Sequence, residues 1–318
     1  MRVSLQQLFA LRRLLALTIA VSLPMLLAAC NRGTEATAKP TVALVVKTLN
    51  NQFFIDMEAG AKAAADSLGI HLVVQAPERE IDVERQMQIV ENLIQRNVKV
   101  LLLVPNGSKE IVPAVVKANT AKIPVVAVDT RVDEPTLKAA GGIVTTFIGS
   151  DNEDGGRMAG AYLTERLGGT AKVAVLEGVP GHETADARLR GFRKALAGVS
   201  GMQIVASQPA NMERDQAFNV TQNILQAHPD ITALFACNDV MALGALEAIA
   251  AAGKGSVISV VGFDAQDDAR KAIAEKRLAA TIAQNPREMG RLAVITAYRL
   301  IKGETVPAEQ PVAISLVK

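Results

Sequence analysis

The sequence is poor in the residues that build metal centres and disulfide frameworks. It has only two cysteines and three histidines among its 318 residues. The histidines, at positions 71, 182 and 228, are far apart and show no metal-ligand spacing. If the thiol of Cys30 carries a lipid, Cys237 has no partner within the chain, so the fold cannot depend on an internal disulfide. We therefore predict no bound metal, no cofactor, and a buried, unreactive thiol at Cys237.

Recognisable catalytic motifs are also missing from the sequence. The glycines of Gly155–Gly160 lack the dinucleotide-binding spacing, and Gly253–Ser256 lacks the upstream glycine of a phosphate loop. The sequence around Ser200 lacks the closing glycine of a nucleophile elbow. These observations predict a protein that is not an enzyme. The alternative is a hydrolase that uses Asp129 and Asp264 as its acid and base.

The small excess of basic over acidic residues in the sequence comes from its first 29 residues. Residues 1–29 contain three of the 34 lysines and arginines and none of the 32 acidic residues, which leaves 31 basic against 32 acidic side chains. Such a balance favours binding to neither nucleic acid nor an anionic membrane surface.

The first 29 residues are typical of a secretory signal, because a basic start without acids precedes an apolar stretch from Leu14 to Ala29. This stretch is shorter than the roughly 20 residues of a membrane-spanning helix. Leu27–Cys30 resembles the lipobox of bacterial lipoproteins, and the resemblance implies cleavage before Cys30 and a lipid on its thiol. The alternative is an ordinary signal peptide. Residues 30–40 are small and polar, so we predict a flexible tether there.

The remaining residues, about 278, are enough for two domains. Short, nearly continuous apolar runs alternate with segments of helical length and spacing. The predicted strands are 42–46, 72–74, 100–104, 125–128, 173–176, 203–206, 233–236, 258–261 and 279–283, and the predicted helices are 53–68, 83–96, 110–120, 154–167, 187–198, 213–227, 239–252 and 286–301. This alternation predicts an α/β fold of doubly wound parallel sheets. A break at 133–146, with one proline and two glycines, is a candidate for the passage between domains.

Polar side chains follow most of the predicted strands. They are Lys47 with Asn51, Asn106, Asp129, Asp151 with Asn152, Asn238 with Asp239, Asp264 and Gln284. Ligands of open α/β sheets bind at the carboxyl ends of the strands, and acids, amides and a cation suit a ligand covered in hydroxyl groups. Phe53, Phe54 and Phe263 add apolar faces beside them. For Asn51 and Asp239 the alternative is helix capping, and for Phe53 and Phe54 it is core packing.

Several longer segments resemble the periplasmic solute-binding proteins of the ribose and allose group, which feed sugar to an ABC importer. The segments are Ala43–Phe54, Arg188 with Gly191 and Phe192, Ala206–Ala210, Asn238–Ala245, Val261–Asp264 and Ala280–Gln284. The resemblance implies two similar lobes, each a doubly wound sheet, that close on a monosaccharide. It places three hinge crossings near Ser150, Gln284 and Ala313. The lobes would be 41–149 plus 285–312, and 150–284 plus 313–318.

The resemblance also implies the roles of individual residues in a sugar site. Those implied to hydrogen-bond the sugar are Asn51, Asp129, Arg188, Asn238, Asp264 and Gln284, and those implied to contact its face are Phe53 and Phe54. Lys47 matches the lysine of allose binders and differs from the serine of ribose binders. Two departures are Thr130, which replaces an arginine of ribose binders, and Met212, which replaces an aromatic residue. Met212 can cover a sugar ring with less specific stacking.

The predicted function is therefore capture of a neutral monosaccharide outside the cytoplasm. Asp129 and Asp264 in the same cleft disfavour a sugar acid or phosphate, because like charges repel. The implied partners are membrane permease subunits with a cytoplasmic ATPase, and the protein would be a monomer in the periplasm, or at the cell surface in a Gram-positive organism. The alternative is a sugar receptor for chemotaxis or a sensor kinase. A sugar-responsive transcription regulator would need a helix-turn-helix where this chain has its signal.

Overall fold

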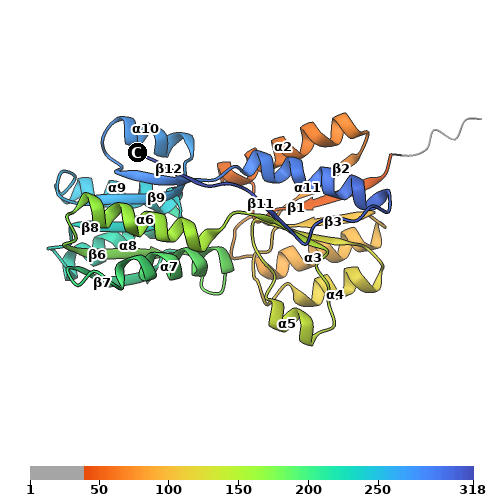
Figure 1. Ribbon diagram of the computed structural model, residues 1–318, viewed down its shortest axis with the longest axis horizontal. Helices are drawn as coiled ribbons and strands as arrows, with labels where there is room; N and C mark the ends of the chain where they lie inside the picture. Colours follow the sequence, from red (N-terminus) through yellow and green to blue (C-terminus); the bar gives the residue numbers. More distant parts are fainter. Residues whose placement is uncertain (1–38) are drawn as a thin grey trace, which may run out of the picture. The chain divides into compact units, whose positions relative to one another are not determined.

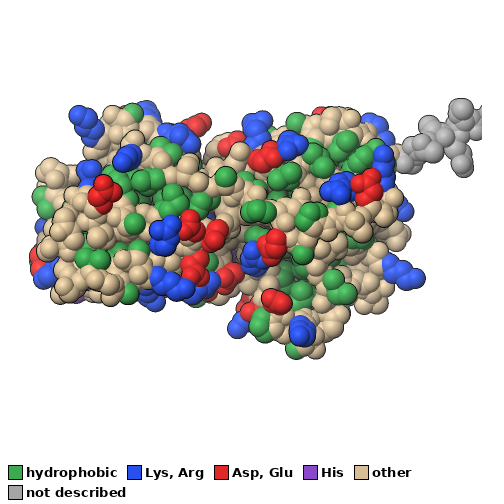
Figure 2. Space-filling view, viewed as in Figure 1, with side chains coloured by type: hydrophobic (Ala, Val, Ile, Leu, Met, Phe, Trp, Pro, Cys, Tyr) green, Lys and Arg blue, Asp and Glu red, His purple; other side chains and the backbone are tan. Residues whose placement is uncertain are grey.

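The computed structural model describes residues 39–318, which contain two six-stranded sheets flanked by helices (Figure 1). The predicted signal, Cys30 and nearly all of the predicted tether lie outside the described residues. No described helix is both long and apolar enough to cross a membrane. Acidic and basic side chains are interspersed over the face shown in Figure 2, which agrees with the balanced charge of the chain.

The first sheet, with its helices, forms what we call the first lobe. Its strand order is β11-β5-β4-β3-β1-β2, and all neighbouring strands are parallel. The strands are β1 (Thr41–Val45), β2 (His71–Gln75), β3 (Val100–Leu103), β4 (Val125–Val128), β5 (Thr146–Gly149) and β11 (Glu309–Pro311). The helices are α2 (Gln52–Leu68), α3 (Val83–Gln95), α4 (Val112–Thr120), α5 (Glu134–Ala139) and α11 (Pro286–Ile301). Helices α2 and α11 pack on one face of this sheet, and α3 and α4 pack on the other (Figure 1).

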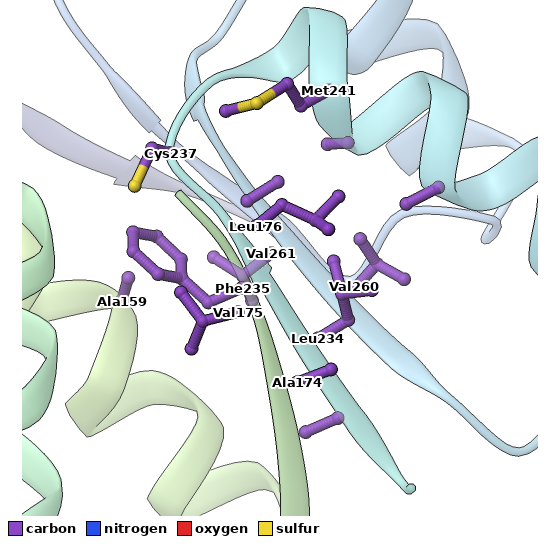
Figure 3. Packing of buried hydrophobic residues seen from close by; sticks show 14 of the residues in the cluster. Ala159, Ala174, Val175, Leu176, Leu234, Phe235, Cys237, Met241, Val260 and Val261 are labelled. Atoms are coloured by element: carbon purple, nitrogen blue, oxygen red, sulfur yellow. The ribbon is translucent and has the colours of Figure 1, made fainter. Parts of the chain in front are cut away.

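The second lobe repeats this arrangement around the order β12-β10-β9-β8-β6-β7, except that β12 is antiparallel to β10. The strands are β6 (Ala171–Glu177), β7 (Met202–Pro209), β8 (Ala233–Ala236), β9 (Ser259–Asp264), β10 (Ala280–Ala283) and β12 (Ser315–Val317). The helices are α6 (Asn152–Arg166), α7 (Glu183–Leu196), α8 (Arg214–Ala227), α9 (Asp239–Ala251) and α10 (Asp267–Ala274). Figure 3 shows part of its core, where Val175, Phe235 and Val261 come from adjacent strands.

The central strands are buried on both faces, which explains why their sequences are continuous apolar runs. Val42 to Val45 and Ala233 to Ala236 are all fully buried. Close helix packing then fixes where the later side chains of the site lie. A Cβ on Gly156 of α6 would stand 1.9 Å from the carbonyl oxygen of Arg188 on α7, so only glycine allows these helices to approach so closely.

The α/β fold-class prediction is confirmed, and each of the nine predicted strands corresponds to a strand of the structure. The prediction that the chain passes between the two domains at 133–146 is wrong. That segment contains α5 and leads into β5, which pairs with β4 in the first sheet. The chain therefore leaves the first sheet only after Gly149. The strands β5, β11 and β12 and the helices α5 and α10 were not predicted.

Candidate functional site

A narrow cleft lies between the carboxyl ends of strands from the two lobes. Its lining contains nine of the eleven ligand-binding residues predicted from the sequence. The first lobe contributes Lys47, Asn51, Phe53, Phe54, Glu80 and Asp129, and the second contributes Thr184, Arg188, Met212, Asn238 and Asp264. Glu80 and Thr184 were not predicted. Phe263 and Gln284 were predicted but stand behind the lining, in contact with residues that form it.

Asn51 and the two phenylalanines after it line the cleft and also begin α2. The Asn51 side chain caps the helix, since its Oδ1 accepts the N–H of Phe53 at 3.0 Å. The rings of Phe53 and Phe54 pack edge to face, with centroids 5.2 Å apart, and only 5% and 3% of each residue is exposed. Capping and core packing, which the sequence offered as alternatives to ligand binding, therefore occur in residues that also face the cleft.

Lys47 stands two residues after the end of β1 and is 2% exposed. Its Nζ lies 3.9 Å from Glu80 Oε2 and 3.9 Å from Asp129 Oδ2, and both distances are too long for hydrogen bonds. Burial raises the pKa of Glu80, and the charge of Lys47 opposes that shift. Asp129 Oδ1 has no hydrogen-bond partner within residues 39–318. The ammonium and both carboxylates therefore retain hydrogen-bonding capacity.

Asn106, another polar residue that follows a strand, supports Lys47 from behind. Its Nδ2 donates to the carbonyl oxygen of Lys47 at 3.3 Å and to that of Arg79 at 3.1 Å. Its Oδ1 accepts from Gln86 Nε2 at 2.7 Å. Asn106 and Gln86 are fully buried, so their amides hold the loops after β1 and β2 together at the edge of the cleft.

Arg188 on α7 is 4% exposed and has several close partners. Its Nε donates to Asn152 Oδ1 at 2.8 Å, and its Nη1 donates to the carbonyl oxygen of Cys237 at 2.6 Å. The guanidinium stacks on Phe263, 3.8 Å from the ring centroid, and its Nη2 lies 3.7 Å from Asp264 Oδ1. Phe263 therefore acts as a platform for Arg188. Burial raises the pKa of the Cys237 thiol to about 12, in agreement with the predicted unreactive cysteine.

Asp264 ends β9 with a φ of 113°, a strained value for any residue with a side chain. Its Oδ1 accepts from Gln284 Nε2 at 2.8 Å. Burial raises the pKa of Asp264 to about 7, while Arg188 pulls it down. Gln284 Oε1 is buried and has no hydrogen-bond partner in the described part of the chain. Nearby, Asn238 caps α9 by accepting the N–H of Met241 at 2.8 Å.

Met212 and Thr184 complete the second wall. Met212 has a φ of 62°, and its methyl group packs over Gly178, where a Cβ would lie only 2.4 Å from Met212 Cε. Thr184 lies four residues before Arg188 on α7, so helical spacing from Arg188 is the signal that could have identified it. Glu80 lies in the loop after β2. The useful signal there was the position of β2 beside β1, because neighbouring parallel strands end at the same edge.

The cleft thus combines two cations, three carboxylates, amides and two aromatic rings. Amides and carboxylates accept hydrogen bonds, cations donate them, and the rings offer apolar surface, so the arrangement suits a compact ligand with polar edges and apolar faces. Over residues 39–318, no group of three or more His, Cys, Asp or Glu side chains is placed to hold a metal ion.

Comparison with known proteins gives consistent matches along most of the chain. The family model of the periplasmic binding protein domain matches residues 42–305. The ribose import binding protein of Salmonella typhimurium is 42% identical over 307 residues, which cover 96% of this chain and 98% of that protein. The D-allose-binding periplasmic protein of Escherichia coli is 35% identical over 287 residues, with coverages of 90% and 92%. An ABC transporter solute-binding protein of Actinobacillus succinogenes, solved with bound D-allose, superimposes with a TM-score of 0.84 at 38% identity and covers 88% of this chain and 98% of its own.

Proposed function

The chain belongs to the periplasmic binding protein family, and from this premise we propose that it captures a neutral monosaccharide in its cleft and delivers it to an ABC sugar permease. The ligand would be an allose-like aldohexose or a ribose-like pentose. Members of this family are solute-binding proteins rather than enzymes. The observation that carries the proposal is the set of buried polar groups in the cleft that stand apart from one another.

Opposite charges in the cleft are separated by 3.7 to 3.9 Å. Surface ion pairs of the same chain, such as Lys62 with Glu58 and Arg131 with Glu309, meet at 2.6 Å. A sugar hydroxyl accepts a hydrogen bond from a cation and donates one to a carboxylate, so it can bridge such a gap. Asp129 Oδ1, a cleft-lining acceptor that lacks a partner among the described residues, would accept from a further hydroxyl. A buried acceptor without a partner costs about 1 to 3 kcal/mol, so a polyhydroxylated ligand is favoured.

Two residues bear on the choice between hexose and pentose. Lys47 matches the lysine of allose binders, and its ammonium faces Glu80 and Asp129 in the first wall. Met212 covers the cleft with a thioether that adapts to different ring shapes. The relatives named above bind ribose or allose according to their names. Lys47 therefore favours the allose-like hexose.

Titration calorimetry with D-allose, D-ribose and a panel of other aldoses, ketoses and polyols tests the proposal. We expect a binding free energy of roughly −8 to −10 kcal/mol for the preferred sugar, which corresponds to micromolar to tens of nanomolar affinity. Asp264→Ala serves as the test variant, because it removes an acceptor from the cleft, takes the nearest carboxylate from Arg188 and leaves Gln284 Nε2 without its acceptor. Absence of binding to every sugar in the panel would refute the proposal.

We also propose that the lobes close about three crossings near Ser150, Gln284 and Ala313, and that a lipid on Cys30 anchors the protein. Pairing of β11 with β5 and of β12 with β10 supports the crossing near Ala313, because the chain changes sheets between these two strands. Hinge closure of this kind follows from preferential ligand binding to the closed form. Mass spectrometry of the mature N-terminus tests the anchor, and an unmodified residue at the cleavage site would exclude it.

A further inference from the structure

Asp239 is a buried carboxylate that the proposed sugar site does not use. The sequence offered it as a helix cap, but Asn238 caps α9 and Asp239 is the first residue of the helix. Asp239 is fully buried. Its Oδ1 accepts from Thr281 Oγ1 at 2.7 Å, and its Oδ2 accepts the backbone N–H of Gln266 at 2.9 Å. A buried carboxylate is costly, so these contacts need a structural or functional reason.

The contacts of Asp239 hold the turn formed by residues 264–266. Asp264 and Ala265 both have positive φ values, 113° and 56°, which cost energy for residues with a side chain. The N–H of Ala265 donates to Thr281 Oγ1 at 3.3 Å, so Asp239 and Thr281 together hold two successive amides of the turn. A Cβ on Gly262 would lie 2.2 Å from Asp239 Oδ1, so the carboxylate packs directly against the backbone of β9.

The same turn sends a side chain across the cleft. Gln266 Nε2 of the second lobe donates to Asn51 Oδ1 of the first lobe at 2.9 Å. Asn51 Oδ1 is also the cap of α2, so the hydrogen bond ends on a fixed atom of the opposite wall. Two consecutive hydrogen bonds therefore connect the core of the second lobe with the rim of the first. One joins Asp239 to the backbone N–H of Gln266, and the other joins the side-chain amide of Gln266 to Asn51.

We propose that Asp239 is a positioning residue of the cleft: it holds the 264–266 turn so that Asp264 faces the ligand and Gln266 forms a closure contact with Asn51. The closure contact joins the two lobes in the closed form and does not involve the sugar. Because the apparent affinity scales with the population of the closed form, the loss of this contact weakens every sugar by the same factor. The part of this proposal that concerns sugar affinity rests on the sugar-binding function proposed above.

The first experiment compares Gln266→Ala with Gln52→Ala by calorimetry with D-allose and D-ribose. Gln52 is a matched control, because it is the exposed neighbour of Asn51 and its side chain, among residues 39–318, hydrogen-bonds only to Asp56 of the same helix. We expect Gln266→Ala to weaken both sugars equally, by about 3- to 10-fold, as for one net hydrogen bond. Gln52→Ala should match the wild type. Equal affinities of the two variants, or a loss confined to one sugar, would overturn the closure contact.

The second experiment asks whether Asp239 acts through Gln266. Asp239→Asn replaces one acceptor with a donor and should weaken sugar binding at least as much as Gln266→Ala. The double variant should bind no more weakly than Asp239→Asn, since coupled residues are not additive. Fully additive losses would refute the positioning role. Should Asp239→Asn not fold, Thr281→Val should reproduce the loss in affinity and Thr281→Ser should restore it; equal affinities of these two variants would count against the network.

Small-angle scattering of the sugar-free proteins gives a readout that does not depend on the ligand. The wild type should be shifted towards the compact form relative to Gln266→Ala, while Gln52→Ala should scatter like the wild type. Identical curves for wild type and Gln266→Ala would overturn the closure contact. If the wild type binds neither sugar, the ligand proposed above is wrong, and the scattering comparison still decides the closure contact.

Discussion

The two cations of the cleft, one in each lobe, have opposite surroundings. Arg188 of the second lobe has two short hydrogen bonds and a ring beneath it, so its orientation is set by the protein. Lys47 of the first lobe has two ion-pair contacts, both 3.9 Å long. Arginine suits the first situation, because its planar fork can satisfy several partners at once. We infer that Arg188 organises the second wall before a ligand arrives, whereas Lys47 keeps its donors for the ligand.

The largest effect is expected from Arg188→Met. The change leaves Asn152, the carbonyl of Cys237 and Asp264 without their cation, and breaking a buried pair costs about 3 to 5 kcal/mol. We expect a loss of sugar affinity of more than about 100-fold, and a free energy of unfolding lower by about 3 kcal/mol. Calorimetry and chemical denaturation measure the two. Arg188→Lys should be nearly as damaging, and near-normal affinity in that variant would contradict the organising role.

A smaller and more selective effect is expected from Lys47→Met. Under the proposed function its ammonium bonds the sugar rather than the fold, so sugar affinity should fall about 10- to 100-fold, as for a lost charged hydrogen bond. The free energy of unfolding should change by less than about 1 kcal/mol, because Glu80, whose pKa burial already raises, can take up a proton when the cation is gone. Lys47→Ser should also shift selectivity from D-allose towards D-ribose. The contrast between the two cations fails if Lys47→Met destabilises the fold as much as Arg188→Met.

A pH effect on stability is expected from His182, a residue of the second lobe whose pKa is influenced by Lys47 of the first. His182 is 2% exposed, and neither ring nitrogen has a hydrogen-bond partner among the residues described. Burial first, and then the charge of Lys47, lowers its pKa to about 2. The folded protein therefore binds fewer protons here than the unfolded chain, where the pKa is about 6.5. Stability should fall as the pH drops below about 6.5, by at most about 1.4 kcal/mol per pH unit.

The measurement is the difference in unfolding free energy between wild type and His182→Gln from pH 7.5 to pH 5. Asp239, Asp264 and Glu80 have raised pKa values, so they stabilise the fold as the pH falls and oppose the effect of His182. They are present in both proteins, so the difference between the two cancels their contribution and isolates that of His182. His71→Gln, at an exposed position, is the control and should follow the wild type. Parallel pH profiles for His182→Gln and wild type would show that this imidazole is not buried in its neutral form.

The central strands could be predicted because burial on both faces leaves a continuous apolar run, as in Val100–Leu103. The edge strands could not. Glu309–Pro311 and Ser315–Val317 are three residues long, carry polar side chains and are strands only because β5 and β10 offer partners. In the site, strand ends identified Lys47, Asp129 and Asp264, because parallel strands end at one edge. That Phe263 lies beneath Arg188 depends on a tertiary contact between β9 and α7 that no local pattern records.

The smallest effect concerns the apolar surfaces of the cleft, where the lobes also differ. The first lobe supplies two rings whose mutual packing fixes them, and the second supplies the thioether of Met212. Met212→Ala should weaken all sugars alike, by about 3- to 10-fold, because a flexible thioether contributes contact area without directional bonds. Met212→Leu keeps the volume and should recover most of that affinity in the same calorimetric series. If Met212→Ala instead alters the ranking of D-allose and D-ribose, the thioether discriminates between ring shapes, and selectivity would then not reside in the first wall alone.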